Sequence, residues 1–268
     1  MSTLFLNAAA TLVFCAPGYP GAPGDAQPYV DQFAKAAVSS AGWNEGSLAA
    51  AYDPTEQGSL KVLNTPDAVL TFVPYAFYVQ YGAQLHLAPI AQADVADVGT
   101  QERWTLIGKA GGPADAAALA GYTIVSVAGY APEFVRHQAL KALTLPADVK
   151  IEASGQVLSA LRRVISSDKV AALLDQTQAA ALPTLPFAAQ LKTLAQSAPL
   201  PVAIIAVVNQ RVPAARAKSF QSALLKLNSI PADADTLAQL HLKRFIMPQL
   251  PADAAGPAMT TATSVSKP

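Results

Sequence analysis

Short apolar runs alternate with helix-like segments along almost the whole chain, and this alternation restricts the fold most. Thr11 to Ala16, Ala68 to Val73 and Val170 to Leu174 have the length and continuous apolarity of buried strands. After Asp25, which can cap a helix, apolar residues recur at helical spacing and leave one apolar face. Strands that alternate with helices predict an α/β fold with mostly parallel sheets.

The same patterns predict the remaining elements. Further strands are expected at Ser47–Tyr52, Leu85–Ala91, Trp104–Gly108, Tyr122–Val127, Val149–Ala153 and Pro201–Val208. Helices are expected at Glu133–Leu143, after a cap at Ser154, in segments up to about Ser197, at Pro213–Leu227 and at Thr236–Ile246. The residues from Pro74 to Tyr78 are expected to form a loop.

The strand–helix series runs twice, which predicts two lobes. The first and last segments, residues 1–92 with 199–250, would form lobe 1, and residues 93–198 would form an inserted lobe 2. The chain would cross between the lobes near Pro89–Ala91 and Pro199–Pro201. The small, polar residues 251–268 are expected to be a disordered tail.

Composition excludes several classes of protein. Hydrophobic residues make up 52% of the chain, but 21 prolines and 15 glycines interrupt it too often for a membrane bundle. The 18 basic and 18 acidic residues balance and do not cluster, so nucleic acid is not an expected partner. The single cysteine, Cys15, excludes an internal disulfide and is expected to be a buried thiol. The first ten residues lack the basic start of a signal peptide, which leaves a cytoplasmic protein or one whose leader was removed.

The stretch from Gln101 to Leu140 locates the expected site. It predicts a strand, a short helix ending at Gly121, a second strand, and then a turn into a longer helix. Open α/β sheets hold ligands where a parallel strand ends and a helix begins.

Several motifs, in this order, resemble one known family. They are Asn64–Leu70, Leu87–Ala91, Asp115–Ile124, Ser167–Asp175 and Ala198–Pro201. Together they resemble type 2 periplasmic solute-binding proteins of the phosphonate-binding-protein-like branch, the substrate-binding components of ABC transporters. The resemblance covers about Leu12 to Leu250.

The resemblance implies a two-lobed, non-catalytic clamp in the periplasm. It implies a monomer that closes on a ligand and presents it to membrane transport machinery, with no cofactor. Phosphonate binders usually have a turn rich in Ser and Thr after the strand of the second lobe. Here that turn is Val127–Pro132, with hydroxyls only at Ser126 and Tyr130 nearby, and Pro132 lacks an N–H.

Four loops are expected at the cleft: residues 17–20, 73–78, 126–131 and 175–177. The candidate ligand-binding residues on them are Tyr19, Tyr75, Phe77, Tyr78, Ser126, Gly129, Tyr130, Asp175, Gln176 and Thr177. The rings could instead fill the core, and Asp175 could instead cap a helix. Tyrosine-rich loops with few charges favour an apolar or amphipathic ligand.

Other motifs do not support catalysis. Gly18, Gly21 and Gly24 lack the spacing of a dinucleotide loop, and the chain has neither a P-loop nor a Gly-x-Ser-x-Gly elbow. His86, His137 and His241 stand alone, without the spacing of metal ligands.

Three hypotheses follow. The first is a solute-binding protein for an apolar or amphipathic ligand, such as a lipid or sterol. The second keeps the fold but holds a phosphonate or phosphate on backbone amides near Gly129 and on Arg136. The third is an enzyme acting on a small metabolite.

Overall fold

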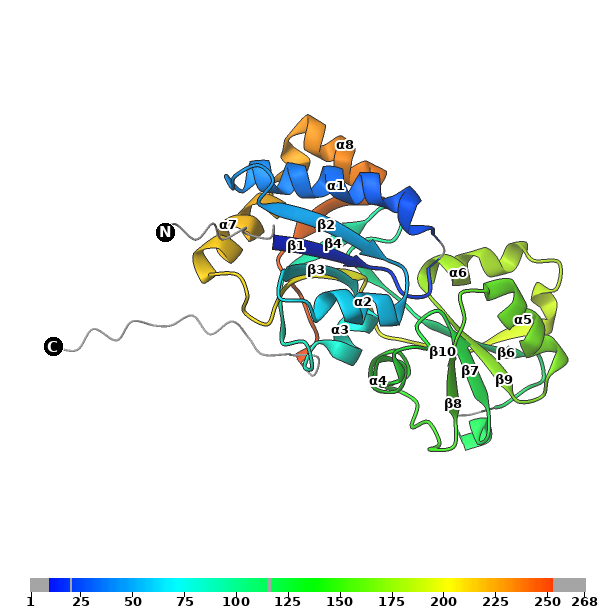
Figure 1. Cartoon of the computed structure of the whole chain (residues 1–268). Helices are drawn as coiled ribbons and strands as arrows, with labels where there is room; N and C mark the ends of the chain where they lie inside the picture. Colours follow the sequence, from blue (N-terminus) through cyan, green and yellow to red (C-terminus); the bar gives the residue numbers. More distant parts are fainter. Residues whose placement is uncertain (1–9, 20, 115–116, 253–268) are drawn as a thin grey trace.

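The computed structural model describes residues 10–19, 21–114 and 117–252 and contains two separate β-sheets (Figure 1). The larger sheet has six strands in the order β13-β4-β12-β3-β1-β2, and the smaller has five in the order β10-β6-β9-β7-β8. We call each sheet with its covering helices the large lobe and the small lobe. The α/β class predicted from the sequence is confirmed.

The strands follow the apolar runs of the sequence closely. In the large sheet they are β1 (Ala10–Cys15), β2 (Leu48–Asp53), β3 (Ala68–Pro74), β4 (Leu87–Val95), β12 (Ala203–Val208) and β13 (Leu242–Ile246). In the small sheet they are β6 (Thr105–Lys109), β7 (Thr123–Ser126), β8 (Lys150–Ala153), β9 (Val170–Leu174) and β10 (Leu191–Gln196). A two-stranded pair, β5 (Gln101–Glu102) and β11 (Leu200–Pro201), stands apart from both sheets.

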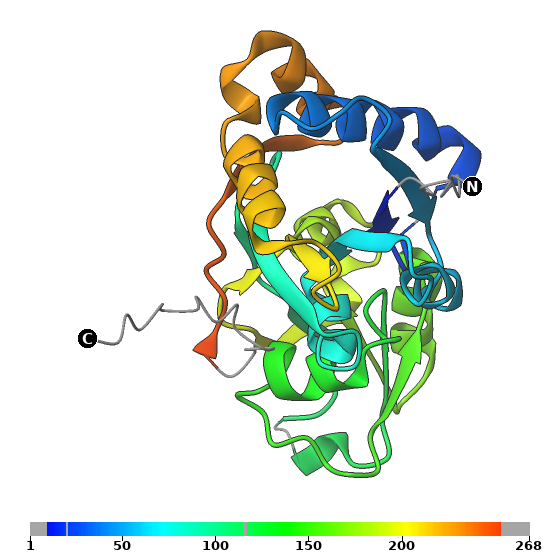
Figure 2. The same ribbon diagram turned by 60° about the vertical axis from the view of Figure 1, so that its left-hand side comes forward.

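Helices cover both faces of the large sheet (Figures 1 and 2). The α-helices are α1 (Pro23–Ser40), α2 (Glu56–Leu63), α3 (Tyr75–Tyr81), α4 (Pro132–Phe134), α5 (Val157–Ser166), α6 (Gln176–Ala181), α7 (Ala214–Leu224) and α8 (Pro231–Gln239). A π-helical turn (Val135–Ala139) continues α4, and short 3-10 turns lie at Ala117–Leu119, Leu182–Thr184, Ala188–Gln190 and Leu227–Ser229. Helices α1, α7 and α8 pack on one face of the large sheet, and α2 and α3 pack on the other.

Both sheets are mixed rather than parallel throughout. Strands β1, β2 and β3 pair in parallel, but β12 runs antiparallel to β3 and β4, and β13 runs antiparallel to β4. Strands β7, β8 and β9 pair in parallel, whereas β6 and β10 enter the small sheet antiparallel. Strand β12 enters the large sheet, and β6 enters the small sheet, directly from the connections between the lobes, where no crossover helix sets the direction.

The β5–β11 pair lies where the chain passes between the lobes. Glu102 is the register partner of Leu200, and Gln101 is that of Pro201. Strand β4 continues to Val95, past residue 92, and stays paired with β13 in the large sheet. The exact division of the chain into 1–92 with 199–250 and 93–198 stays a prediction.

Three predictions of secondary structure were wrong. The expected loop from Pro74 to Tyr78 contains helix α3, because packing of its buried aromatic side chains outweighs their modest helix propensity. The region expected to be helical up to Ser197 includes strand β10, and the expected helix Thr236–Ile246 is the end of α8 followed by strand β13. Both strands carry a register shift, between Thr193 and Ala195 and between Leu242 and Arg244, which breaks the alternation that marks a strand.

Two predicted caps and one helix also need correction. Helix α1 begins after Ala22 without a side-chain cap, and Asp25 lies in its first turn. Helix α5 begins after Gln156, while the Ser154 hydroxyl accepts a bond from the Gln156 backbone N–H instead. The helix expected at Glu133–Leu143 ends at residue 139 and is π-helical over its last five residues.

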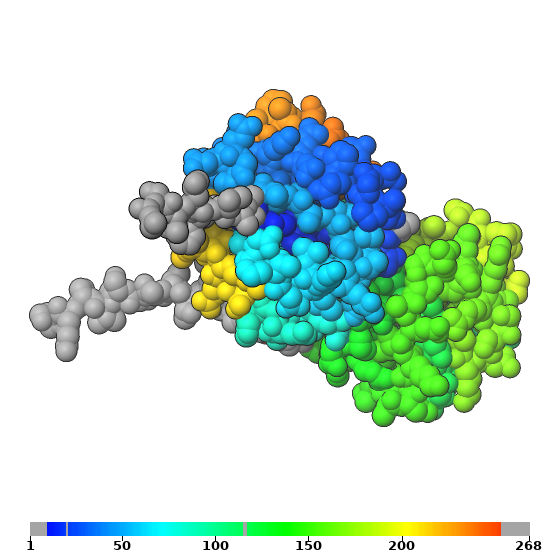
Figure 3. All heavy atoms as spheres, in the orientation of Figure 1, coloured from blue at the N-terminus to red at the C-terminus, as the bar shows by residue number. Residues whose placement is uncertain are grey.

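A hydrophobic cluster joins the two lobes. It includes Val13 and Leu63 from the large lobe and Leu106 and Ile124 from the small lobe, all of them buried. Figure 3 shows atoms of the two lobes meeting along a seam. The lobes are therefore closed on each other. Of the helices in the described ranges, none is long and apolar enough to cross a membrane. The predicted tail lies almost wholly outside the described residues.

Candidate functional site

A small buried cavity lies at the junction of the lobes. Its volume is about 10 Å³, which is close to the minimum that holds one water molecule. The large lobe contributes Tyr19, Pro74, Tyr75, Ala76 and Val202, and the small lobe with the β5 link contributes Glu102, Trp104, Val127, Ala128, Tyr130 and Phe134. The cavity thus lies where closing lobes would enclose a ligand.

Aromatic rings from both lobes form the walls of the cavity. The ring of Phe134 lies edge-on to Tyr75 at a centroid distance of 6.0 Å and edge-on to Trp104 at 5.2 Å. Tyr75 stacks on Tyr78 at 6.2 Å, and Tyr130 contacts Phe77 at 6.4 Å. Because Tyr75 comes from α3 and Phe134 from α4, this ring network crosses the seam between the lobes.

Two carboxyl groups are buried beside these rings. Glu102 and Asp175 are only 7% and 5% exposed. Burial and the nearby Asp175 carboxylate raise the pKa of Glu102 to about 8, although the Gln176 backbone N–H and the Trp104 indole oppose this. Burial also raises the pKa of Asp175, against the bonds it accepts from the backbone N–H groups of Gln178 and Thr177 and from Tyr19. At neutral pH, Glu102 is therefore largely protonated in the closed protein.

Tyr19 connects the large lobe to these acids. The residue as a whole is 37% exposed, but its phenol end is buried and donates a hydrogen bond to Asp175. Burial first, and then the charges of Glu102 and Asp175, raise the pKa of Tyr19 well above its usual value. The phenol therefore stays protonated and acts as a donor.

No lysine, arginine or histidine is found among the described residues that line the cavity. The guanidinium of Arg136 donates instead to the carbonyl oxygens of Pro146 and Val149, the first at 3.3 Å. It lines a separate surface hollow with His137 and Lys141. Arg103, next to Glu102 in sequence, donates to the carbonyl of Ser197 at 2.8 Å. In this closed structure Arg136 is therefore not placed to contact a ligand in the cavity, as the oxyanion hypothesis required.

The turn after β7 uses much of its own hydrogen-bonding capacity. The Gly129 N–H donates to the Ser126 carbonyl at 3.1 Å, and the Ala131 N–H donates to the Ala128 carbonyl at 2.9 Å. The Ser126 hydroxyl donates to the Leu173 carbonyl and accepts from the Ala128 N–H. These groups hold the turn in place and, in this closed state, are not directed at a ligand.

Of the ten predicted site residues, some line the cavity and the others have structural roles in this closed state. Tyr19, Tyr75 and Tyr130 line the cavity. Phe77 and Tyr78 lie in the core, and Ser126 and Gly129 serve the turn. Asp175 caps helix α6 in a capping box with Gln178, the Gln176 side chain accepts from the Arg103 N–H, and the Thr177 N–H donates to Asp175.

Sequence reasoning gave no role to Glu102, Trp104 or Phe134. Glu102 precedes a buried strand in a chain with only 13% charged residues, and that rarity was the available signal. Its position on the short β5–β11 pair could not be read from the sequence, because a two-residue strand has no periodicity.

Gly18 and Gly155 allow the backbones of the two lobes to approach each other closely. Gly18 has a φ of +86°, and a Cβ at this position would lie 2.5 Å from the carbonyl oxygen of Val127. A Cβ at Gly155 would lie 2.7 Å from the carbonyl oxygen of Gly18. Real Cβ atoms do not come this close to backbone atoms. The lobes can therefore close in this way only because these two residues are glycines.

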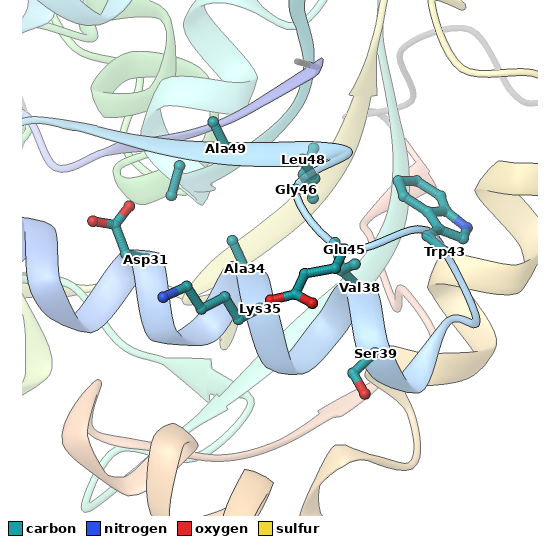
Figure 4. Close-up of a pocket in the computed structure, with 11 residues that line it drawn as sticks. Asp31, Ala34, Lys35, Val38, Ser39, Trp43, Glu45, Gly46, Leu48 and Ala49 are labelled. Atoms are coloured by element: carbon teal, nitrogen blue, oxygen red, sulfur yellow. The ribbon is translucent and has the colours of Figure 1, made fainter.

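A larger hollow lies elsewhere, between helix α1 and strand β2. It has a volume of about 650 Å³, and Figure 4 shows Asp31, Lys35 and Glu45 along it with Trp43 at one end. All of its lining residues belong to the large lobe, so closure of the lobes cannot enclose a ligand there. In the described part of the chain, no group of three or more His, Cys, Asp or Glu residues is placed to hold a metal ion.

A family model matches residues 69–253, which make up more than half of the chain. It describes the periplasmic substrate-binding protein of phosphonate ABC transporters. This chain belongs to that family. A comparison with curated proteins found no match.

Solved structures share the fold of this phosphonate-binding family member. XAC2383 from Xanthomonas citri, bound to ATP, is 14% identical with a TM-score of 0.66, over 91% of this chain and 92% of that one. A binding-protein component of an ABC phosphonate transporter from Pseudomonas aeruginosa is 16% identical with a TM-score of 0.55, over 90% and 82%. PhnD1 from Prochlorococcus marinus, in complex with methylphosphonate, is 15% identical with a TM-score of 0.52, over 89% and 93%. The expected two-lobed type 2 periplasmic-binding-protein fold is confirmed.

Proposed function

We propose that this protein captures a small polar solute between its lobes and delivers it to the membrane components of an ABC importer. Membership of a periplasmic substrate-binding family supports a transport role in the periplasm rather than catalysis. The observation that carries the proposal is the cavity between the lobes, with walls from both of them. The β5–β11 pair would act as the hinge, with lobes near residues 1–92 with 199–250 and 93–198.

The family model makes a phosphonate-type oxyanion the first ligand to test. The predicted lipid or sterol ligand has no support from the family or from the similar structures described above. The two buried carboxyl groups beside the cavity also suit a bulky apolar molecule poorly. Tyr19, Tyr75, Tyr130 and Asp175 are proposed to contact the solute, together with Glu102.

Lobe closure on a solute tests this function directly. Spin labels on Lys35 of the large lobe and Arg162 of the small lobe would report the distance between lobes by pulsed electron resonance. We expect a mixture of open and closed distances without solute and a shift to the closed distance when one compound from a library of small polar solutes binds. A single distance that no compound changes would contradict solute capture. A pair of labels within the large lobe is the control.

A further inference from the structure

We propose that the solute held by this cleft is a small organic ammonium ion with an oxygen atom close to its nitrogen, as in an amino alcohol. Glu102 and Asp175 would hold the cationic nitrogen, the aromatic rings would surround it, and the indole N–H of Trp104 would donate to the oxygen. The inference rests on the proposed capture of a solute between the lobes. It reverses the charge that the family description leads one to expect.

The first argument is the charge of the buried groups. Glu102 lines the cavity, and Asp175, at the end of β9, lies close enough for its charge to raise the pKa of Glu102. Neither forms an ion pair among those found in the described residues. Buried carboxylates require a cation, a proton or several donors, since an uncompensated charge in the interior is costly. Arg103 is next to Glu102 in sequence, and Arg136 lies in the π-helical turn that follows the matching turn. Both donate to backbone carbonyls elsewhere. The compensating charge can come from a ligand.

The aromatic walls give the second argument. Trp104, Tyr75, Phe134 and Tyr130 line the same cavity as Glu102. The face of an aromatic ring attracts a cation, and tryptophan attracts it most strongly. An oxyanion would gain no comparable attraction from these rings, and it would bind beside Glu102 only while that carboxyl keeps its proton.

An incompletely bonded donor gives the third, independent argument. Trp104 is 3% exposed, and its indole N–H faces Glu102 closely enough to lower the pKa of that carboxyl. The contact does not have the distance and angle of a hydrogen bond, so the indole nitrogen is buried without a proper acceptor. Buried donors without an acceptor are rare in proteins, and each one costs free energy of folding. An oxygen on the ligand would complete this bond.

Part of each carboxyl group has a structural partner. One oxygen of Asp175 accepts the N–H of Gln178 at 2.8 Å and caps helix α6, and Glu102 faces the N–H of Gln176. Tyr19 donates to Asp175, while Tyr130 lies close enough to affect the pKa of Tyr19. These contacts orient the carboxyl groups but leave no basic side chain of the described residues against them. Because its pKa is raised to about 8, Glu102 can hold a proton at neutral pH when no cation is beside it.

Competition between this proton and the ligand predicts the sign of the pH dependence. An ammonium ion must displace the proton from Glu102, so its affinity should rise as pH increases towards about 8, the pKa of Glu102 in the closed protein. An oxyanion would instead accept a hydrogen bond from protonated Glu102, and its affinity should fall over the same interval. The two ligand classes therefore give opposite slopes.

Titration calorimetry on the full chain tests the inference. The probes are ethanolamine and choline, propylamine as a cation without the oxygen, and methylphosphonate and inorganic phosphate as oxyanions. We expect ethanolamine or choline to bind more tightly than propylamine, with an affinity about fiftyfold higher at about pH 8 than at about pH 6 and with release of a proton. The Glu102→Gln variant should bind ammonium at least about tenfold more weakly, and Glu45→Gln on the surface should bind it normally.

Two results would overturn the inference. One is that neither ammonium probe binds at about 10 mM. The other is that an oxyanion binds and its affinity falls as pH rises. The pH series uses the unmodified chain, so the test stands even if the Glu102 variant folds poorly. Oxyanion binding that closes the lobes would refute the cationic ligand but leave solute capture intact, whereas lobes that close on no solute would refute both.

Discussion

Two aromatic clusters of similar size differ in their location and in the polar groups that their rings carry. One lies inside the large lobe, where Phe14, Phe33, Phe72 and Phe245 contact one another at centroid distances of 5.4 to 6.1 Å. The other lies at the seam, where Trp104, Phe134, Tyr75 and Tyr130 surround a cavity next to Glu102. The first consists only of hydrocarbon rings, and the second carries polar groups on three of its four rings.

The difference shows how ring chemistry separates stability from recognition. Phenylalanine rings contribute burial and edge-to-face contact and do not require a polar partner. Tyrosine and tryptophan at the seam bring donors that must be satisfied whenever the lobes close. The large-lobe cluster should therefore control unfolding, and the seam cluster should control closure and ligand choice.

The largest effect is expected when the large-lobe cluster loses a ring. Phe33 is fully buried and contacts both Phe14 and Phe245, so Phe33→Ala should cost about 3 to 5 kcal/mol of unfolding free energy by leaving a cavity. Urea denaturation measures this. Tyr29→Ala on the exposed side of the same helix should cost under about 1 kcal/mol. Equal losses in the two variants would contradict a dominant role for the Phe cluster.

A methyl group at the seam should act on closure more than on stability. In Gly18→Ala the new Cβ would collide with the Val127 carbonyl, and we expect ligand affinity to fall at least about tenfold because the lobes cannot close. Gly42→Ala is the matched control, since Gly42 has a similar φ of +68° but no heavy atom within 4 Å of the added Cβ. Both variants share a backbone strain of about 1 kcal/mol. If Gly18→Ala closes normally in the spin-label experiment, the seam is looser than the structure indicates.

The pH dependence of stability should report the buried acid at the seam. Because the pKa of Glu102 is raised from 4.5 to about 8, the folded protein holds a proton that the unfolded chain releases between these values. Stability should therefore fall as pH rises from about 5 to about 8, by at most about 1.4 kcal/mol per pH unit, and level off above. The fall should be smaller in Glu102→Gln, and Glu45→Gln should retain it. An identical slope in Glu102→Gln and the unmodified protein would show that other groups cause it.

The smallest change in stability is expected from Trp104→Phe. Loss of ring volume is offset by removal of a buried N–H that lacks a proper acceptor, so unfolding free energy should change by less than about 1 kcal/mol. Ligand affinity should still decrease, because the donor to the ligand oxygen is lost. Denaturation and calorimetry on the same sample separate the two effects. A large loss of stability with unchanged affinity would place Trp104 among the purely structural residues.

The sequence predicted the fold well because strands such as β1, β9 and β12 are buried along most or all of their length and read as continuous apolar runs. It failed for β10 and β13, where a register shift in each strand brings residues out of alternation. Leu242 and Phe245 are spaced as in a helix, and both are buried in the strand.

The candidate site was only partly predictable. Tyr19, Tyr75 and Tyr130 were expected to lie together because loops at strand ends should meet, and all three line the cavity. Glu102 and Trp104 were not, because their importance depends on which groups from distant segments surround them. Arg136 was misplaced because the sequence does not reveal that its guanidinium turns towards the carbonyls of Pro146 and Val149.

Glu102 lies on β5, a strand of two residues in the connection between the lobes. A bend in this connection also reorients the Glu102 carboxyl, so movement of the lobes and the position of this charge are coupled. Substitutions at Leu200 and Pro201, which pair with β5, should thus change ligand preference without contacting the ligand. In this protein, ligand selectivity can therefore change through the β5–β11 pair rather than through the residues that line the cavity.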